Sequence, residues 1–266
     1  MASRETINSL REAFQIHPGE VISLVGAGGK TTLMFALSQE LISPKKLVIT
    51  TTTTKILAPS PSQSPSLLIS REEQEIVDFI LKNGIHLGHI TVASERLTAS
   101  GKLQGINVRL VSRLMKLDPV SYIIVEADGA AHRPLKAPDP TFEPVIPQST
   151  SMVIPVIGID ALGCELVEEY VFRSKIAAQL TGTALGEIVT ADTIAILMTH
   201  PLGMISGTPA HSRIIPFINK IDVHPDLLKA RDLASRILEA NHPQIDRVVL
   251  GKAQFNPPVA EVVFKR

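Results

Sequence analysis

The chain has 266 residues, of which 44% are hydrophobic and 20% are charged, and its 26 basic residues balance its 26 acidic residues to a formal net charge of zero. This composition excludes a disordered chain, and the absence of net positive charge argues against a dedicated nucleic-acid binder, which needs a basic face. One cysteine, Cys164, excludes an internal disulfide and a cysteine-based zinc site.

The chain also has no sign of a membrane or export segment. No apolar run approaches the roughly 20 residues that a membrane-spanning helix needs. The first residues are polar and contain no apolar signal core. We therefore expect a cytoplasmic protein that binds neither nucleic acid nor a membrane.

Strands and helices are predicted to alternate along the chain. Continuous apolar runs indicate buried strands, and apolar residues spaced three or four apart indicate helices. In chain order, the expected elements are a helix over 4–15, strand 20–25, helix 30–42, strand 46–51, helix 71–82, strand material over 88–105, helix 107–117, strands 120–126 and 151–158, helix 165–180, strand 213–218, helix 226–240 and a final strand 246–250. Residues 191–199 fit either a capped helix or an apolar strand.

This alternation predicts an α/β fold, with a mostly parallel sheet covered by helices on both faces, of the P-loop NTPase type. No composition shift marks a domain boundary. We expect one domain over residues 1–266, with insertions at about 56–118 and 130–150.

The sharpest motif lies at residues 21–32, where a strand runs into a glycine-rich loop and then into a helix. Glycines let several backbone N–H groups point at an anion, and the helix N-terminus adds partial positive charge. In such loops the lysine reaches the β- and γ-phosphates and the following hydroxyl binds Mg²⁺, roles that fall here to Lys30 and Thr31. The full pattern has a glycine at position 24, where this chain has Leu24; the alternative is a glycine-rich turn with an incidental lysine. The candidate nucleotide-binding residues are Gly26, Ala27, Gly28, Gly29, Lys30, Thr31 and Thr32.

Two acidic residues follow the apolar strand at 120–126. In phosphate-loop enzymes a carboxylate at the end of a neighbouring strand holds Mg²⁺ or its water. We favour Glu126 as that ligand, together with Thr31, and expect Asp128 to orient water or a partner. The alternative is that one acid merely caps the next turn. Lys30, Glu126 and Asp128 are the candidate catalytic residues.

A base-recognition motif ends the strand at 213–218. Asn219-Lys220-Ile221-Asp222 resembles the N-K-x-D guanine motif of GTPases. The Asp222 carboxylate can accept two hydrogens from guanine that adenine does not offer as a pair, and charge-assisted bonds of this kind contribute roughly 1.5–3 kcal/mol each. We expect Lys220 to cover the base and Asn219 to tie this loop to the glycine loop. The alternative is an ordinary polar strand end.

Two further polar clusters are candidates for contact with a substrate or partner. Ligands of open α/β sheets bind beyond the carboxyl ends of the strands. The threonine run after the second strand therefore offers Thr53, Thr54 and Lys55, and the proline-stiffened loop after Asp128 offers Arg133 and Lys136. Solvated threonines and cations are the alternative in each case.

Together, the segments VISLVGAGGKTTLMFAL, VITTTTTKI, IIVEADGAAHRPLKAP and FINKID resemble the selenium-dependent hydroxylase accessory proteins, the YqeC-like family. The resemblance runs from the first strand to the last and includes the departure at Leu24. It implies an accessory role in the maturation of selenium-dependent molybdenum hydroxylases, with such a hydroxylase or its cofactor-maturation proteins as partners. The chain is more distantly similar to the GTPases that mature urease and hydrogenase, which implies GTP·Mg²⁺ binding, hydrolysis as a switch, and a homodimer as one arrangement.

The sequence thus predicts a nucleotide-binding protein that uses Mg²⁺ and GTP, with ATP as the other nucleotide. Two alternatives stay open. One is a small-molecule kinase in which the Arg133 and Lys136 loop binds an anionic acceptor. The other is a nucleotide-gated scaffold that does not hydrolyse nucleotide.

Overall fold

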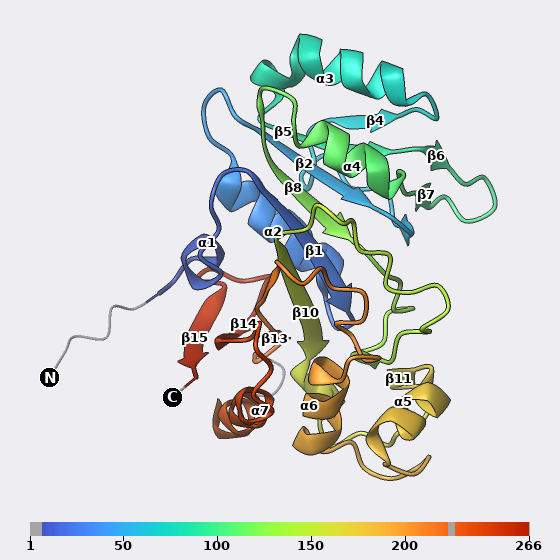
Figure 1. The fold of residues 1–266 in the computed structure, drawn as a ribbon, viewed down its shortest axis with the longest axis vertical. Coiled ribbons are helices and arrows are strands. Elements are labelled where there is room, and N and C mark those ends of the chain that lie inside the picture. The colour runs from blue at the N-terminus through green and yellow to red at the C-terminus, as the bar shows by residue number, and fades with distance from the viewer. Residues whose placement is uncertain (1–6, 223–226, 266) are drawn as a thin grey trace, which may run out of the picture.

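The computed structural model describes residues 7–222 and 227–265, and it places one large sheet between layers of helices (Figure 1). The strand order is β15-β14-β13-β10-β1-β8-β2-β5-β4, and β12 also pairs with β10. The strands are β1 (Glu20–Gly26), β2 (Leu47–Thr52), β4 (Leu67–Ile69), β5 (His89–Ala93), β8 (Val120–Glu126), β10 (Met152–Gly158), β12 (Arg213–Ile214), β13 (Phe217–Asn219), β14 (Arg247–Gly251) and β15 (Val259–Phe264). Only β15 pairs antiparallel in this sheet as described, which confirms the predicted α/β class.

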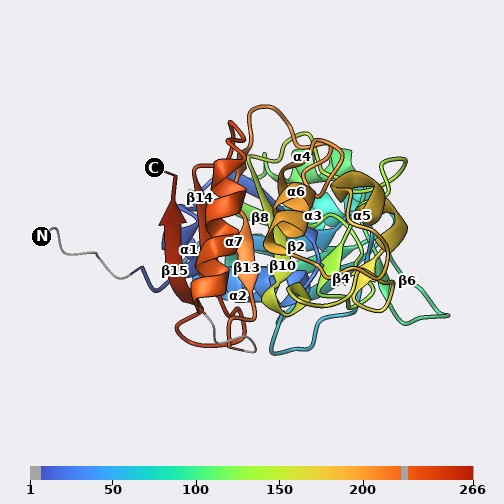
Figure 2. The same ribbon diagram turned by 90° about the horizontal axis from the view of Figure 1, so that it is seen from below.

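Helices cover both faces because the buried strands carry apolar residues on both sides. Ile22 and Leu24 of β1 pack in the cluster that holds α1 (Leu10–Ala13) and α2 (Lys30–Leu41). Val21 and Val25 face the opposite cluster, which holds the remaining helices. These are α3 (Glu73–Leu87), α4 (Val108–Leu114), α5 (Ser174–Thr181), α6 (Ala191–Thr199) and α7 (Leu227–Glu239). Helices α6 and α7 pack side by side on this face (Figure 2).

Two small sheets lie beside the main one. Strands β3 (Lys55–Ile56), β7 (Leu103–Gln104) and β6 (Glu95–Arg96) form one, and β9 (Leu135–Lys136) pairs with β11 (Val171–Phe172) in the other. Residues 56–118, which we expect to be an insertion, also supply β4 and β5 to the main sheet. Within the described ranges, no helix is long and apolar enough to cross a membrane.

Most predicted elements lie within a few residues of observed ones, including β1, α2, β2, β8 and β10. The strand material over 88–105 forms β5, β6 and β7, and the helix expected over 107–117 is α4. The ambiguous segment 191–199 is the helix α6, with a capping box made by Thr190 and Thr193. Of the helix predicted over 4–15, only Leu10–Ala13 is helical in the described part, and residues 1–6 lie outside it. Residue 226, the first of the helix predicted over 226–240, also lies outside the described residues.

Three predictions are wrong. The helix expected over 165–180 begins only at Ser174, because Val171 and Phe172 pair with β9 and the Glu168 carboxylate accepts the backbone N–H groups of Arg173 and Ser174. The strand expected over 213–218 is split into β12 and β13 around Pro216, which has no N–H to donate. The strand β14 is not the last, because β15 follows it at the sheet edge.

Candidate functional site

A cavity of about 500 Å³ opens at the carboxyl edge of the sheet, a volume that suits a small-molecule ligand. The parallel strands β1, β8, β10, β13 and β14 all end at this edge. Their C-terminal residues and the loops that follow form the cavity wall, as expected for an open α/β sheet. The site is therefore assembled from segments between residues 28 and 255.

The loop between β1 and α2 has three residues, 27–29. Leu24 lies inside β1, buried between its neighbours in β8 and β10, so position 24 belongs to the strand and not to the loop. Gly28 and Gly29 have φ angles of 73° and 122°. A side chain on Gly28 would collide with the backbone of Gly158, and one on Gly29 with the Asn219 side chain. Glycine is therefore required at both positions by conformation and by space.

The backbone N–H groups of this loop divide into two sets. Those of Gly26, Ala27 and Gly28 are bonded inside the protein, to the Asp128 carboxylate and to the carbonyl oxygens of Val156 and Arg133. The N–H groups from Gly29 to Thr32 begin α2, where helix geometry gives them no partner within the helix, and no side chain caps them. Four donors at a helix N-terminus are an anion-binding arrangement.

Lys30 is nearly fully buried beside this N-terminus. Its Nζ donates to the Gly26 carbonyl oxygen at 2.6 Å and lies 3.1 Å from Asp128 Oδ1 and 3.9 Å from Glu126 Oε1. Burial lowers the pKa of Lys30, but the two carboxylates outweigh it, so the pKa stands above its ordinary value. The ammonium group is thus a fixed cation at the floor of the cavity.

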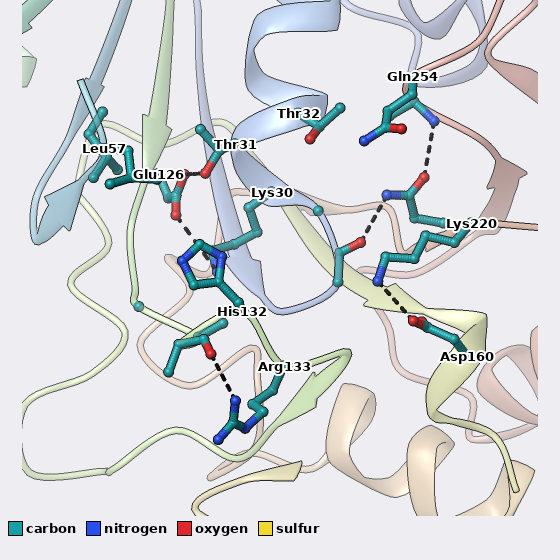
Figure 3. A pocket seen from close by; sticks show the side chains of 18 of the residues that line it. Lys30, Thr31, Thr32, Leu57, Glu126, His132, Arg133, Asp160, Lys220 and Gln254 are labelled. Atoms are coloured by element: carbon teal, nitrogen blue, oxygen red, sulfur yellow. Dashed lines mark hydrogen bonds and ion pairs between the residues drawn. The ribbon is translucent and has the colours of Figure 1, made fainter. Parts of the chain in front are cut away.

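Glu126 and Thr31 provide adjacent oxygen ligands. The Thr31 hydroxyl donates to Glu126 Oε2 at 2.7 Å, and both residues line the cavity (Figure 3). Burial raises the pKa of Glu126, while Lys30 and Thr31 act in the opposite direction. Across the described residues, no three His, Cys, Asp or Glu side chains gather as a metal cage. One carboxylate and one hydroxyl nevertheless fit Mg²⁺ that arrives with phosphate and keeps several waters.

Asp128 lies behind the glycine loop and does not line the cavity. Its Oδ2 accepts from the Gly26 N–H at 2.9 Å and lies 3.0 Å from the Lys136 Nζ. Lys136 is fully buried and also contacts the Glu143 carboxylate at 2.8 Å, which Arg173 reaches from the other side at 2.7 Å. Asp128 and Lys136 therefore suit a positioning role behind the loop, in place of the water and substrate contacts predicted from the sequence.

The threonine run also points away from the cavity. Thr52 and Thr53 donate their hydroxyls to the carbonyl oxygens of Glu126 and Val145, and Thr54 lies against the Thr52 hydroxyl. Neither Thr53 nor Thr54 lines the cavity, whereas Lys55 does. These hydroxyls are thus committed to joining β2 to the segments beside it.

Arg133 lines the cavity, but its guanidinium is tied elsewhere. Its Nε donates to the Glu168 carbonyl oxygen at 2.9 Å and Nη1 donates to that of Ala131 at 3.4 Å (Figure 3). The neighbouring His132 also lines the cavity, with an exposed side chain and a φ of 61°. The sequence therefore predicted that this loop lies at the cavity, but it did not predict which way the Arg133 guanidinium points.

The opposite end of the cavity holds the predicted base motif. Asn219 Nδ2 donates to the Gly28 carbonyl oxygen at 2.9 Å, which is the tie to the glycine loop expected from the sequence, and Asn219 Oδ1 accepts from the Ala253 N–H. Lys220 pairs with Asp160 at 2.8 Å (Figure 3). Asp222 is exposed at the cavity edge.

Several cavity residues were not predicted as site residues. Among them are Leu57, Lys102, His132, Gln254 and Phe255, all of which line the cavity. Lys102 and Phe255 lie on connections far along the chain from the motifs. Only the position of Gln254 and Phe255 just after β14 gives a signal, because strand ends of a parallel sheet meet at one edge.

Comparisons with known proteins give one family. The family model described as YqeC protein matches residues 22–175, which is more than half of the chain. The uncharacterized protein YqeC of Escherichia coli (strain K12) is 30% identical over 246 residues, which cover 90% of each chain. No solved structure matches the chain.

Proposed function

The chain belongs to the YqeC family, and we propose that it binds GTP with Mg²⁺ in the cavity at the carboxyl edge of its sheet. In the proposed complex the unpaired N–H groups at the start of α2 and the Lys30 ammonium hold the β- and γ-phosphates. The observation that carries the proposal is this convergence of four backbone donors and a buried cation in a cavity of about 500 Å³.

Thr31 and Glu126 would hold the Mg²⁺ ion. The chemistry that such an ion would supply is neutralisation of negative charge on the phosphate. The other contributions come from protein groups that are held in fixed positions around the phosphates. Asp128 holds Lys30 and the Gly26 N–H in place, and burial of the Lys30 ammonium strengthens its interaction with an anion.

Guanine selectivity rests on Asp222 at the far end of the same cavity. Asn219 bonds both the glycine loop and the loop after β14, which fixes the distance between phosphate and base sites. The Lys220 side chain, held by Asp160, provides an aliphatic surface for the base.

The wider role follows from the resemblance of the motifs to the selenium-dependent hydroxylase accessory proteins. The protein would couple GTP binding or hydrolysis to the handling of a molybdenum hydroxylase or its cofactor during maturation. This maturation role depends on nucleotide binding, so nucleotide binding is the first thing to test.

The first test is calorimetric titration of GTP and of ATP, each with Mg²⁺, into the purified chain. We expect GTP to bind at least tenfold more tightly than ATP, because one extra charge-assisted bond suffices for that ratio. Lys30→Ala should weaken GTP binding at least tenfold. Because Lys30 also offsets buried carboxylates, circular dichroism must show that the variant is folded. Undiminished affinity in a folded Lys30→Ala protein would remove the phosphate-site assignment.

The guanine assignment has its own variant, since Asp222 is exposed and its replacement leaves the core intact. Asp222→Asn should weaken GTP about 10- to 100-fold, leave ATP affinity unchanged, and improve binding of xanthosine triphosphate. The matched control is Asp78→Asn on the exposed face of α3. If both variants bind GTP like the natural protein, Asp222 does not read the base.

A further inference from the structure

The cavity continues past the start of α2, away from the base motif. Figure 3 shows Leu57 on the side of Thr31 and Glu126, with Lys220, Asp160 and Gln254 at the other end. Lys55, Leu57, Lys102 and His132 all line the cavity. A nucleotide held by the glycine loop with its base near Asp222 would leave the Leu57 end beside its terminal phosphate.

The small sheet fixes the geometry of this end. Lys55 lies opposite Gln104 and Ile56 opposite Leu103, and Leu57 and Lys102 are the residues that directly follow β3 and directly precede β7. Lys55, Leu57 and Lys102 all line the cavity, so the connections of this ribbon bring two lysines and one apolar side chain to this end of it. Ile56 and Leu103 are buried in the core cluster, which anchors the ribbon at this end of the cavity.

The side chains at the Leu57 end of the cavity carry an excess of positive charge. Within residues 7–222 and 227–265, neither Lys55 nor Lys102 has an ion-pair partner, and the cavity acid Glu126 already bonds Thr31 and lies near Lys30. Lys136 and Lys220, by contrast, are each paired with acids. Two unpaired ammonium groups that line the same cavity attract an anion, and together they match a dianion better than a monoanion.

We propose that Lys55, Lys102 and His132 form a second subsite, which binds a small phosphate monoester beside the terminal phosphate of the nucleotide. The half-exposed Leu57 side chain (51%) supplies apolar contact for the organic part of that molecule. The position relative to the nucleotide rests on the proposed function, but the subsite itself rests on the place of its residues in the cavity and on their charges.

Phenyl phosphate is the probe, since it combines a dianion with an apolar body, and benzoate is the matched monoanion. Calorimetric titrations use the full chain alone and saturated with Mg²⁺ and a non-hydrolysable GTP analogue. We expect phenyl phosphate to bind the loaded protein and benzoate to bind at least tenfold more weakly. Lys55→Ala and Lys102→Ala should each weaken phenyl phosphate about five- to tenfold. The control Lys82→Ala removes one exposed lysine from α3 and should change nothing.

The outcomes separate the two proposals. Failure of phenyl phosphate to bind the loaded protein, displacement of the probe by the analogue, or an equal loss in Lys82→Ala would each overturn the subsite. Weaker analogue binding by Lys55→Ala and Lys102→Ala would overturn it too, since these lysines would then belong to the nucleotide site. If GTP does not bind but phenyl phosphate does, with the same dependence on Lys55 and Lys102, the subsite is supported and the proposed function fails.

Discussion

Lys136 has no exposed surface, yet it carries a charge in the middle of a chain of ionic contacts. Its ammonium contacts the carboxylates of Asp128 and Glu143 and donates to the Gly129 carbonyl oxygen at 2.6 Å. A buried ion is costly unless its partners surround it. The contacts of Asp128 with the glycine loop depend on this arrangement, so a residue outside the cavity helps to set the geometry of its floor.

We expect Lys136→Met to lower the free energy of unfolding by about 3–5 kcal/mol, because it leaves the buried carboxylate of Asp128 and the partly buried carboxylate of Glu143 without their shared cation. Urea denaturation measures this loss. The matched control is Arg231→Met, which breaks a partly exposed pair with Glu261 and should cost less than about 1 kcal/mol. Equal losses in the two variants would contradict the view that Lys136 organises a buried network.

At the scale of elements, the sequence predicted the central strands well and the irregular ones poorly. Uninterrupted apolar runs mark β1, β8 and β10, because both faces of a central parallel strand are buried. The segment before α5 has apolar residues at helical spacing, but its backbone bonds go to β9 and to the Glu168 side chain, which no local pattern reveals. Strand β15 follows two prolines and is partly exposed, so its pattern is weak.

Strands β2 and β5 contain buried polar side chains that form hydrogen bonds with one another. His89 has no exposed surface, and its Nε2 lies 3.0 Å from the Thr50 hydroxyl, which also bonds the Thr91 hydroxyl at 2.7 Å. Burial lowers the pKa of His89 to about 4. The native protein therefore keeps this imidazole neutral over a range in which an unfolded chain takes up a proton.

The stability contributed by neutral His89 should be complete above about pH 6.5 and lost as the pH falls towards 4, with a total loss of up to about 3 kcal/mol. Denaturation at a series of pH values measures it. His89→Gln should flatten this part of the profile relative to the natural protein, whereas His86→Gln, at an exposed position of α3, should leave it unchanged. An unaltered profile in His89→Gln would show that another group titrates there.

At the scale of the whole molecule, the sequence predicts which strand ends meet at the site. It does not predict which side chains contact one another there. The parallel order implies that Gly26, Glu126 and Asn219 end strands at one edge, and they do. Burial of Lys136, the outward bonds of Arg133 and the approach of Lys102 depend on loops packed from distant parts of the chain. Those contacts have no periodicity that a sequence could show.

Occupation of a cavity built from most of the chain should stabilise the entire fold. GTP with Mg²⁺ at about 100 times its dissociation constant should add roughly 2.7 kcal/mol to the free energy of unfolding. For a chain of this size that corresponds to a rise in melting temperature of roughly 5–10 °C. Thermal denaturation with and without nucleotide measures it. At the same nucleotide concentration Lys30→Ala, which should bind at least tenfold more weakly, should show about half of this rise or less, and a rise of the same size in that variant would place the ligand elsewhere.

The bond from Asn219 to the Gly28 carbonyl oxygen joins positions 191 residues apart. Contacts across so long a separation require closure of a large loop, so they form late when a chain refolds. The β1–α2 unit is local and needs no such closure. Recovery of a fluorescent nucleotide's signal after dilution from denaturant should therefore lag behind recovery of helical circular dichroism, which would make the nucleotide a reporter of the last step of folding.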